Sequence, residues 1–274
     1  MKARILTAIG IAIFGIPILI FSQYLFYPIA ISLLSVIAIF EMSGLTGFRK
    51  SPTVMIPAYL IAAALPVCGY YALDIGKYLL YSAFAVFVYM MYLFAYAVLK
   101  HGNISFASIS AHFVSFAYIA VSFTALCLVR YIANGGYYFL LVFVASWICD
   151  SFAYFIGRAI GKHKLIPEIS PKKTIEGAIG GVVCTTLCFV LFGFIVSMIS
   201  DLTPKYFILS LFGFALSIVA QFGDLIASLI KREHGVKDYG NIFPGHGGVL
   251  DRFDSILAVA PFLLALCVIL PPLA

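Results

Sequence analysis

Charge is scarce in this chain. Of its 274 residues, 17 are Lys or Arg and 11 are Asp or Glu, so that 10% are charged, against roughly 25% in a typical soluble domain. Hydrophobic residues account for 64%. This composition excludes an ordinary soluble domain and indicates an integral membrane protein.

Several sequence signatures are also missing. The six cysteines lie in apolar runs without a CxxC pair or zinc-finger spacing, so we interpret them as packing residues. No GxxxxGK[ST] phosphate-binding loop occurs. We therefore expect neither a zinc finger nor a P-loop nucleotide site, and we expect no nucleic-acid partner.

The apolar runs predict an all-α, polytopic membrane protein with about nine transmembrane helices. A helix needs roughly 20 residues to cross about 30 Å of hydrocarbon, whereas barrel strands would alternate over about 10 residues. The first run follows Lys2 and Arg4 and lacks a small-residue cleavage site, so we interpret it as a retained helix rather than a signal peptide. The expected spans are 5–22, 26–46, 53–72, 78–99, 104–129, 136–160, 175–199, 206–232 and 249–271.

Basic residues fall mostly on one side of these nine expected spans. The N-terminus and every second connection hold 14 of the 17, while the other side holds Lys77, Arg130 and Lys205. By the positive-inside rule, this bias predicts a cytoplasmic N-terminus and a C-terminus outside. The two long loops, 161–174 and 233–248, are then cytoplasmic, and the protein is a multi-pass protein of the cytoplasmic (inner) membrane.

The positions of the polar residues that could take part in chemistry divide the chain into two parts. We expect residues 1–130 to form about five helices for packing or oligomerisation, and residues 131–274 to form the catalytic part with both long loops. Small residues such as Gly177, Gly180 and Gly181 permit close helix packing either within one protomer or in a homodimer.

Five polar residues near the last two spans suggest a cation site. Asp224, Ser228 and Lys231 share one face of a helix, and Asp251 and Asp254 share a face of the next. Three convergent carboxylates without Cys or His suit a hard cation such as Mg²⁺. The alternative is that Asp224 pairs with Lys231 or with a neighbouring helix, while Asp251 and Asp254 lie at a helix N-terminus, where negative charge is favoured.

The loop between those helices is rich in glycine. Its glycines and Pro244 allow the backbone to approach a ligand closely. Because the loop leads into a helix start, it is a candidate phosphate cradle made of free N–H groups and basic side chains. The basic side chains around it are Lys231, Arg232, Lys237 and His246.

Isolated polar residues in other spans have two interpretations. Asp150 either pairs with Arg158 or faces the same polar cavity as Asp224. Glu41 and His112 are explained by hydrogen bonding between helices, and we assign them no catalytic role.

The loop before residue 175 carries two helix-start signals, at Ser170–Pro171 and at Thr174. Lys172 and Lys173 oppose a helix dipole at such a position, which makes sense if a phosphate binds there. Alternatively, both lysines are membrane anchors on the cytoplasmic side.

The second half of the chain resembles the phosphatidate cytidylyltransferases, or CDP-diacylglycerol synthases. The family signature is matched without departure by Ser228, Ile230, Lys231-Arg232, Lys237-Asp238, Gly240, Phe243-Pro244-Gly245-His246-Gly247-Gly248 and Asp251-Arg252-Phe253-Asp254. A second shared region is matched by Asp150, Gly157-Arg158, Gly161-Lys162 and Ser170 to Gly177. Residues 1–130 carry no part of the resemblance.

The resemblance implies transfer of CMP from CTP to phosphatidic acid with Mg²⁺, giving CDP-diacylglycerol and pyrophosphate. The lipid phosphate would attack the α-phosphate in line, with room in the carboxylate cluster for a second cation. The implied metal ligands are Asp224, Asp251 and Asp254. The implied catalytic residues are Lys231, Arg232, Lys237, His246, Asp251 and Arg252. The implied substrate-binding residues are Ser228, Lys172, Lys173, Thr174, Gly247, Gly248 and Asp150.

Two other functions are weighed against this one. A transporter would carry paired repeats and charge on both sides of the membrane, whereas the charge here lies on one side. A CTP-dependent kinase of a polyprenol-type lipid would need a base for a hydroxyl group, which His246 or Asp238 could supply.

Overall fold

The computed structural model describes residues 17–273, and this part of the chain is mostly helical. Within it, eight helical segments are long and apolar enough to cross a membrane. They agree with the predicted spans from the second to the ninth, while the first, 5–22, lies largely outside the described residues. The spans are α2 (Phe26–Thr46), α3 (Pro52–Tyr70), α4 (Ile75–Leu99), α5 (Phe106–Val129), the segment Gly135–Ile160, α8 (Ile175–Ile199), α9 (Tyr206–Glu233) and α10 (Leu250–Ile269).

The chain divides into two compact units. The first contains Met1–Leu128 together with Asp238–Arg252, and the second contains Val129–Lys237 together with Phe253–Ala274. The glycine-rich segment after α9, Asp238–Arg252, therefore belongs to the same unit as the N-terminal helices. The predicted division at residue 130 would place it with the C-terminal helices instead. By the same boundaries, α10 begins in the first unit and continues in the second from Phe253.

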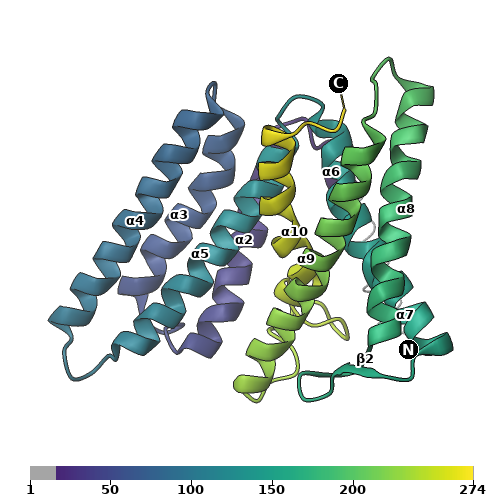
Figure 1. Ribbon diagram of the computed structural model, residues 1–274. Coiled ribbons are helices and arrows are strands. Elements are labelled where there is room, and N and C mark those ends of the chain that lie inside the picture. Colours follow the sequence, from purple (N-terminus) through teal and green to yellow (C-terminus); the bar gives the residue numbers. More distant parts are fainter. Residues whose placement is uncertain (1–16, 274) are drawn as a thin grey trace. The chain divides into compact units, whose positions relative to one another are not determined.

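In the first unit, α2 to α5 run side by side (Figure 1). Tyrosine hydroxyls tie them together, because a polar group surrounded by apolar side chains is costly without a partner. Tyr27 donates to the carbonyl of Leu126 at 2.9 Å, and Tyr78 donates to that of Leu65 at 2.6 Å. These bonds join α2 to α5 and α4 to α3.

His112 on α5 completes this network. Its Nδ1 lies 3.3 Å from Thr46 Oγ1, and its Nε2 lies 3.0 Å from the Tyr89 hydroxyl. The predicted role of this histidine in helix-to-helix hydrogen bonding is confirmed.

The second unit begins with a helix that contains a π-helical turn. α6 (Gly135–Phe143) passes through η1 (Val144–Ile148) into α7 (Cys149–Ile160). π-Helical turns inside α-helices are frequent at functional sites, and this one ends just before Asp150.

A two-stranded antiparallel sheet follows α7. It is formed by β1 (Lys164–Ile166) and β2 (Ser170–Thr174). The helix start predicted at Ser170–Pro171 is wrong, because these residues lie in β2. The start predicted at Thr174 is confirmed, since its hydroxyl accepts the N–H of Gly177 at 3.2 Å and caps α8.

Small residues let α8 pack closely against both of its neighbours. A Cβ on Gly181 would lie 3.0 Å from the backbone oxygen of Cys149 in α7, and one on Gly213 of α9 would lie 2.8 Å from the Cα of Thr186. The glycine face around Gly181 is therefore used for packing within one unit, and α8 and α9 run side by side (Figure 1).

The C-terminal tail folds back onto the second unit. The Leu273 carbonyl accepts hydrogen bonds from Asn134 Nδ2 at 3.4 Å and from the Tyr138 hydroxyl at 3.3 Å. The N–H of Lys205 donates to the Pro272 carbonyl at 2.9 Å. The tail thus joins the start of α6 to the turn between α8 and α9.

Candidate active site

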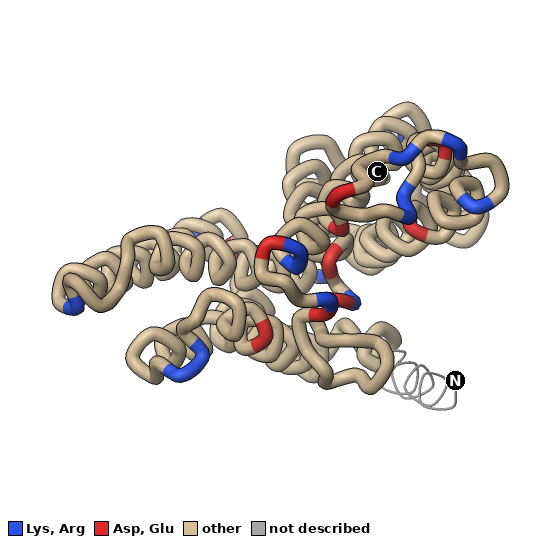
Figure 2. Tube along the Cα trace, turned by 90° about the horizontal axis from the view of Figure 1, so that it is seen from below, with Lys and Arg blue, Asp and Glu red and all other residues tan. Residues whose placement is uncertain are grey.

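Charged residues occupy few positions along the chain, with long uncharged stretches of helix between them (Figure 2). In the second unit, three carboxylates from different helices lie near enough to interact electrostatically: Asp150 of α7, Asp224 of α9 and Asp254 of α10. Lys173 and Lys231 are the cations that oppose this charge. Of the two interpretations of Asp150, the structure favours the one that places it in a polar site with Asp224.

Asp224 is paired with a lysine from the hairpin. Lys173 Nζ in β2 lies 2.6 Å from Asp224 Oδ2, and about a quarter of each side chain remains exposed (25% and 27%). Ser228, one turn further along α9, has its hydroxyl 3.5 Å from Asp224 Oδ1, as the shared helix face predicts. The observed partner, Lys173, comes from the hairpin and was not among the partners named from the sequence.

The other two carboxylates contact the same serine of α10. Ser255 Oγ donates to Asp150 Oδ2 at 3.2 Å, and the N–H of Ser255 donates to Asp254 Oδ1 at 2.9 Å. Arg158, the other partner considered for Asp150, instead lies near the Tyr154 hydroxyl, at 3.3 Å. Ser255 links α7 to α10 next to the carboxylates, and no sequence signal singled it out.

The chemistry of this carboxylate group suits a hard cation, since all of its ligating atoms are oxygens. In the described arrangement, Lys173 supplies the positive charge next to Asp224. Among the described residues, no three His, Cys, Asp or Glu side chains already surround a common point as metal ligands would.

In the first unit, Asp251 organises the glycine-rich segment. Its Oδ2 accepts the N–H of Tyr239 at 2.8 Å and the N–H of Gly248 at 2.9 Å, and the residue is 6% exposed. Gly247 has φ of 84° and a Cβ there would lie 2.7 Å from Asp251 Oδ2, so this position requires glycine. The observed role of Asp251 is to hold the backbone of this segment. Its roles in catalysis and metal binding stay predictions.

Glu41 of α2 holds the start of α10 in the same unit. Its Oε1 accepts the N–H of Val249 at 2.9 Å and its Oε2 accepts that of Leu250 at 3.0 Å, and the residue is 4% exposed. A side chain on Gly240 or Gly248 would collide with the Glu41 carboxylate. The predicted helix-to-helix hydrogen bonding is confirmed, and the carboxylate also explains two glycines of the signature.

These contacts change the interpretation of the loop as a phosphate cradle. The N–H groups of Gly248, Val249 and Leu250 are not free, because they donate to Asp251 and Glu41. Two carboxylates already take the favoured anion position at this helix N-terminus. The substrate contacts predicted for Gly247 and Gly248 remain predictions.

The remaining predicted residues are distributed over both units. In the second unit, Arg232, Lys237 and Lys172 are exposed, and Thr174 is buried as the cap of α8. In the first unit, Arg252 is exposed on the first turn of α10, and His246 is half-buried with a buried Nδ1 that has no hydrogen-bond partner among the described residues.

The hairpin that carries Lys173 is fastened to α8. Glu176 Oε1 lies 2.6 Å from His163 Nδ1, and the same carboxylate accepts the N–H of His163 at 3.2 Å. The N–H of Ile175 donates to the His163 carbonyl at 2.9 Å. Histidines at water-exposed helix ends carry little sequence information, so this positioning pair was missed.

Comparison with known proteins identifies the family of this chain. The chain matches the profile described as the Cytidylyltransferase family over residues 2–270. The chain belongs to the cytidylyltransferase family. The match covers almost the whole chain, so it includes the first 130 residues, in which the motifs gave no resemblance.

Curated members of the cytidylyltransferase family are similar along their full length. A phosphatidate cytidylyltransferase of Staphylococcus epidermidis is 37% identical over 266 residues, which cover 96% of this chain and 97% of the relative. The protein of that name from Bacillus subtilis is 36% identical over 270 residues, 96% of each chain. A third, from Staphylococcus aureus, is 38% identical over 273 residues, 96% of this chain and 97% of the relative.

Proposed function

We propose that this protein transfers the cytidylyl group of CTP to phosphatidic acid, giving CDP-diacylglycerol and pyrophosphate. The observation that carries the proposal is full-length similarity to phosphatidate cytidylyltransferases. The site supports it, because three carboxylates and a hairpin lysine lie together within a helical membrane protein.

The reaction fits a site without an obvious general base. The phosphate of phosphatidic acid is already anionic at neutral pH, so its oxygen can attack the α-phosphorus of CTP directly. A new P–O bond forms, the bond from the α-phosphorus to the bridging oxygen breaks, and pyrophosphate leaves with that oxygen. Catalysis then depends on positioning and on neutralising charge.

The carboxylates are assigned to Mg²⁺. Asp224 and Asp254 would hold it, with Asp150 alongside and with capacity for a second cation, and the motif adds Asp251. When bound, Mg²⁺ would neutralise the phosphate charge and hold the triphosphate in line. Ser255 keeps Asp150 and Asp254 oriented.

The cations are assigned to the phosphates. Near the carboxylates, Lys173 would contact the triphosphate once it leaves Asp224, with Lys172 and the Thr174 cap on the same strand. The remaining basic groups would bind the pyrophosphate or the lipid phosphate: Lys231, Arg232, Lys237, His246 and Arg252. Residues 131–274 would thus form the catalytic part, while residues 1–130 support packing or a homodimer.

The proposed topology has nine spans, with the N-terminus and both long loops in the cytoplasm and the C-terminus outside. It predicts that a single cysteine placed at Asn241, an exposed residue near His246, reacts with a membrane-impermeant maleimide only after cells are opened. A cysteine at Asp201, in the exposed turn between α8 and α9, should react in intact cells. The reverse pattern would refute the orientation.

Purified protein with α-labelled CTP, phosphatidic acid and Mg²⁺ tests the activity. We expect the label to move into a lipid that co-migrates with CDP-diacylglycerol on thin-layer chromatography. Label that appears only in CDP, with a polyprenol as acceptor, would support the lipid kinase instead. Transport of CTP without chemical change would support the transporter.

A further inference from the structure

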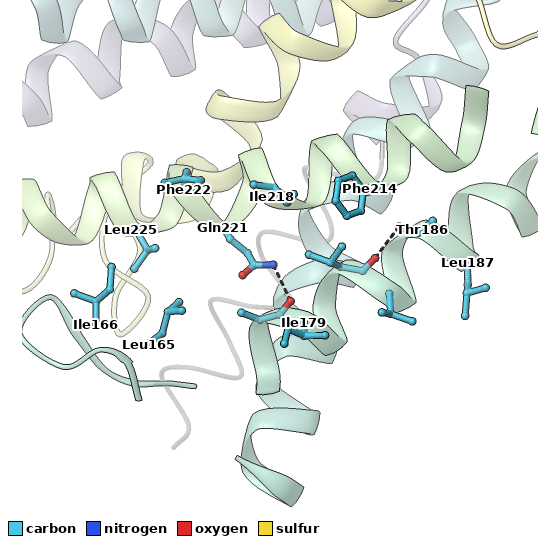
Figure 3. Close-up of a pocket in the computed structure, with 13 residues that line it drawn as sticks. Leu165, Ile166, Ile179, Thr186, Leu187, Phe214, Ile218, Gln221, Phe222 and Leu225 are labelled. Carbon is cyan, nitrogen blue, oxygen red and sulfur yellow. Dashed lines mark hydrogen bonds between the residues drawn. The ribbon is translucent and has the colours of Figure 1, made fainter. Parts of the chain in front are cut away.

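An apolar cavity of about 630 Å³ lies along α8 and α9 in the second unit (Figure 3). Ile179 and Leu187 of α8 and Phe214 and Ile218 of α9 are among the residues that line it. Gln221 is one of two polar residues in the lining. The cavity therefore suits a hydrocarbon chain better than a polar metabolite.

The two helices are held together at two levels along the cavity. At one level, Gln221 Nε2 donates to the Ala178 carbonyl at 3.1 Å. At the other level, Gly213 lies against the backbone of Thr186. The two levels are eight residues apart on each helix, about 12 Å at 1.5 Å per residue, so the cavity is elongated along the helices.

The Gln221 end of the cavity adjoins the candidate active site. Gln221 lies one helical turn before Asp224 on α9. The hairpin links the two places as well, since β1 contributes Leu165 and Ile166 to the cavity lining while β2 contributes Lys173 to the ion pair with Asp224. An occupant with an anionic head and an apolar tail would match both features.

We propose that this cavity binds an acyl chain of the lipid substrate while the lipid's phosphate lies at the Asp224–Lys173 end. The inference rests on the proposed function, because it takes the substrate to be phosphatidic acid. Bilayer lipid would fill any lipid-facing groove, but two apolar residues of the hairpin strand that precedes β2 also line this cavity, next to the strand that carries Lys173. This lining from the hairpin favours a lipid whose head is held beside Lys173.

The far end of the cavity offers a matched pair of substitutions. Leu187 lines the cavity and is 63% exposed, while Leu191, one turn further along α8, does not line it and is 55% exposed. Leu187→Trp places a bulky ring at the end distant from Gln221 and should shorten the cavity. Leu191→Trp makes the same chemical change on the same helix outside it.

The test measures the KM for phosphatidic acid in mixed micelles with long (dioleoyl) and short (dihexanoyl) acyl chains. For Leu187→Trp we expect a KM about 10-fold higher with the dioleoyl lipid, since a misfit of one methylene in an apolar pocket costs about this much selectivity. With the dihexanoyl lipid, whose chains end before the ring, we expect less than a twofold change. Leu191→Trp should match wild type with both.

Each contrary outcome has a distinct meaning. Equal kinetics of the two variants with both lipids would overturn the inference and indicate that bilayer lipid fills the groove. An equal loss with both lipids in Leu187→Trp would also overturn it, because the effect would then be structural. Wild-type protein that labels neither lipid from α-labelled CTP would overturn the proposed function itself.

Discussion

Replacing Asp224 with Asn is expected to lower CDP-diacylglycerol formation by about 100-fold or more, the usual cost of removing one group that stabilises charge in a transition state. The substitution keeps the size of the side chain but removes the charge that pairs with Lys173 and that we assign to Mg²⁺. The rate should be measured over a range of Mg²⁺ concentrations with α-labelled CTP. Turnover near that of wild type at saturating Mg²⁺ would reject the metal role.

Asp201→Asn is the matched control for this experiment. It is the same chemical change in the same unit, at an exposed residue in the turn after α8. We expect it to leave the rate within about twofold, because exposed surface substitutions are usually close to neutral. Thermal unfolding in detergent should be similar for both variants, so that a loss confined to Asp224→Asn reports on the site.

Replacing Glu41 with Ala is expected to release the glycine-rich segment and the start of α10. The Val249 and Leu250 N–H groups would lose their buried acceptor, and hydrogen bonds to a charged group contribute about 1.5–3 kcal/mol each. We expect deuterium exchange in the peptide that covers residues 240–252 to accelerate at least 10-fold, and activity to fall with it. Glu41→Gln, which keeps one carbonyl oxygen, should be intermediate.

Glu233→Ala serves as the control, since Glu233 is an exposed acid at the end of α9. Its exchange pattern around residues 240–252 should match that of wild type. If Glu41→Ala left the exchange of this peptide unchanged, the carboxylate would not be what holds the segment. Lost activity without faster exchange would instead point to a direct role in the reaction.

The helical layout follows from the sequence because hydropathy is a local property. Each span needs about 20 apolar residues, so a single chain shows where helices begin and end without information about their partners. This is why the eight described spans agree with the expected ones. The strands of the hairpin are only three and five residues long, and Ser170–Pro171 is equally typical of a helix start, so the pairing with β1 could not be seen.

The contacts of the candidate site could be predicted from the sequence only where they lie within one helix. Spacing along one helix shows that Asp224 and Ser228 share a face, and the structure has them in contact. Spacing cannot show that Lys173 comes across from another element to pair with Asp224. Glu41 carried a usable signal, since a lone carboxylate in an apolar span is costly without partners, but the signal does not say which N–H groups are those partners.

The anchored C-terminal tail affects how the orientation of the protein can be measured. Enzyme and fluorescent reporters are commonly fused to the last residue of a membrane protein to show which side it occupies. Here a reporter fused after Ala274 would begin one residue beyond Leu273, whose carbonyl accepts hydrogen bonds from Asn134 and Tyr138. A flexible Gly/Ser linker of about 10 residues would separate the reporter from these contacts, so that its signal reflects the compartment and not a disturbed fold.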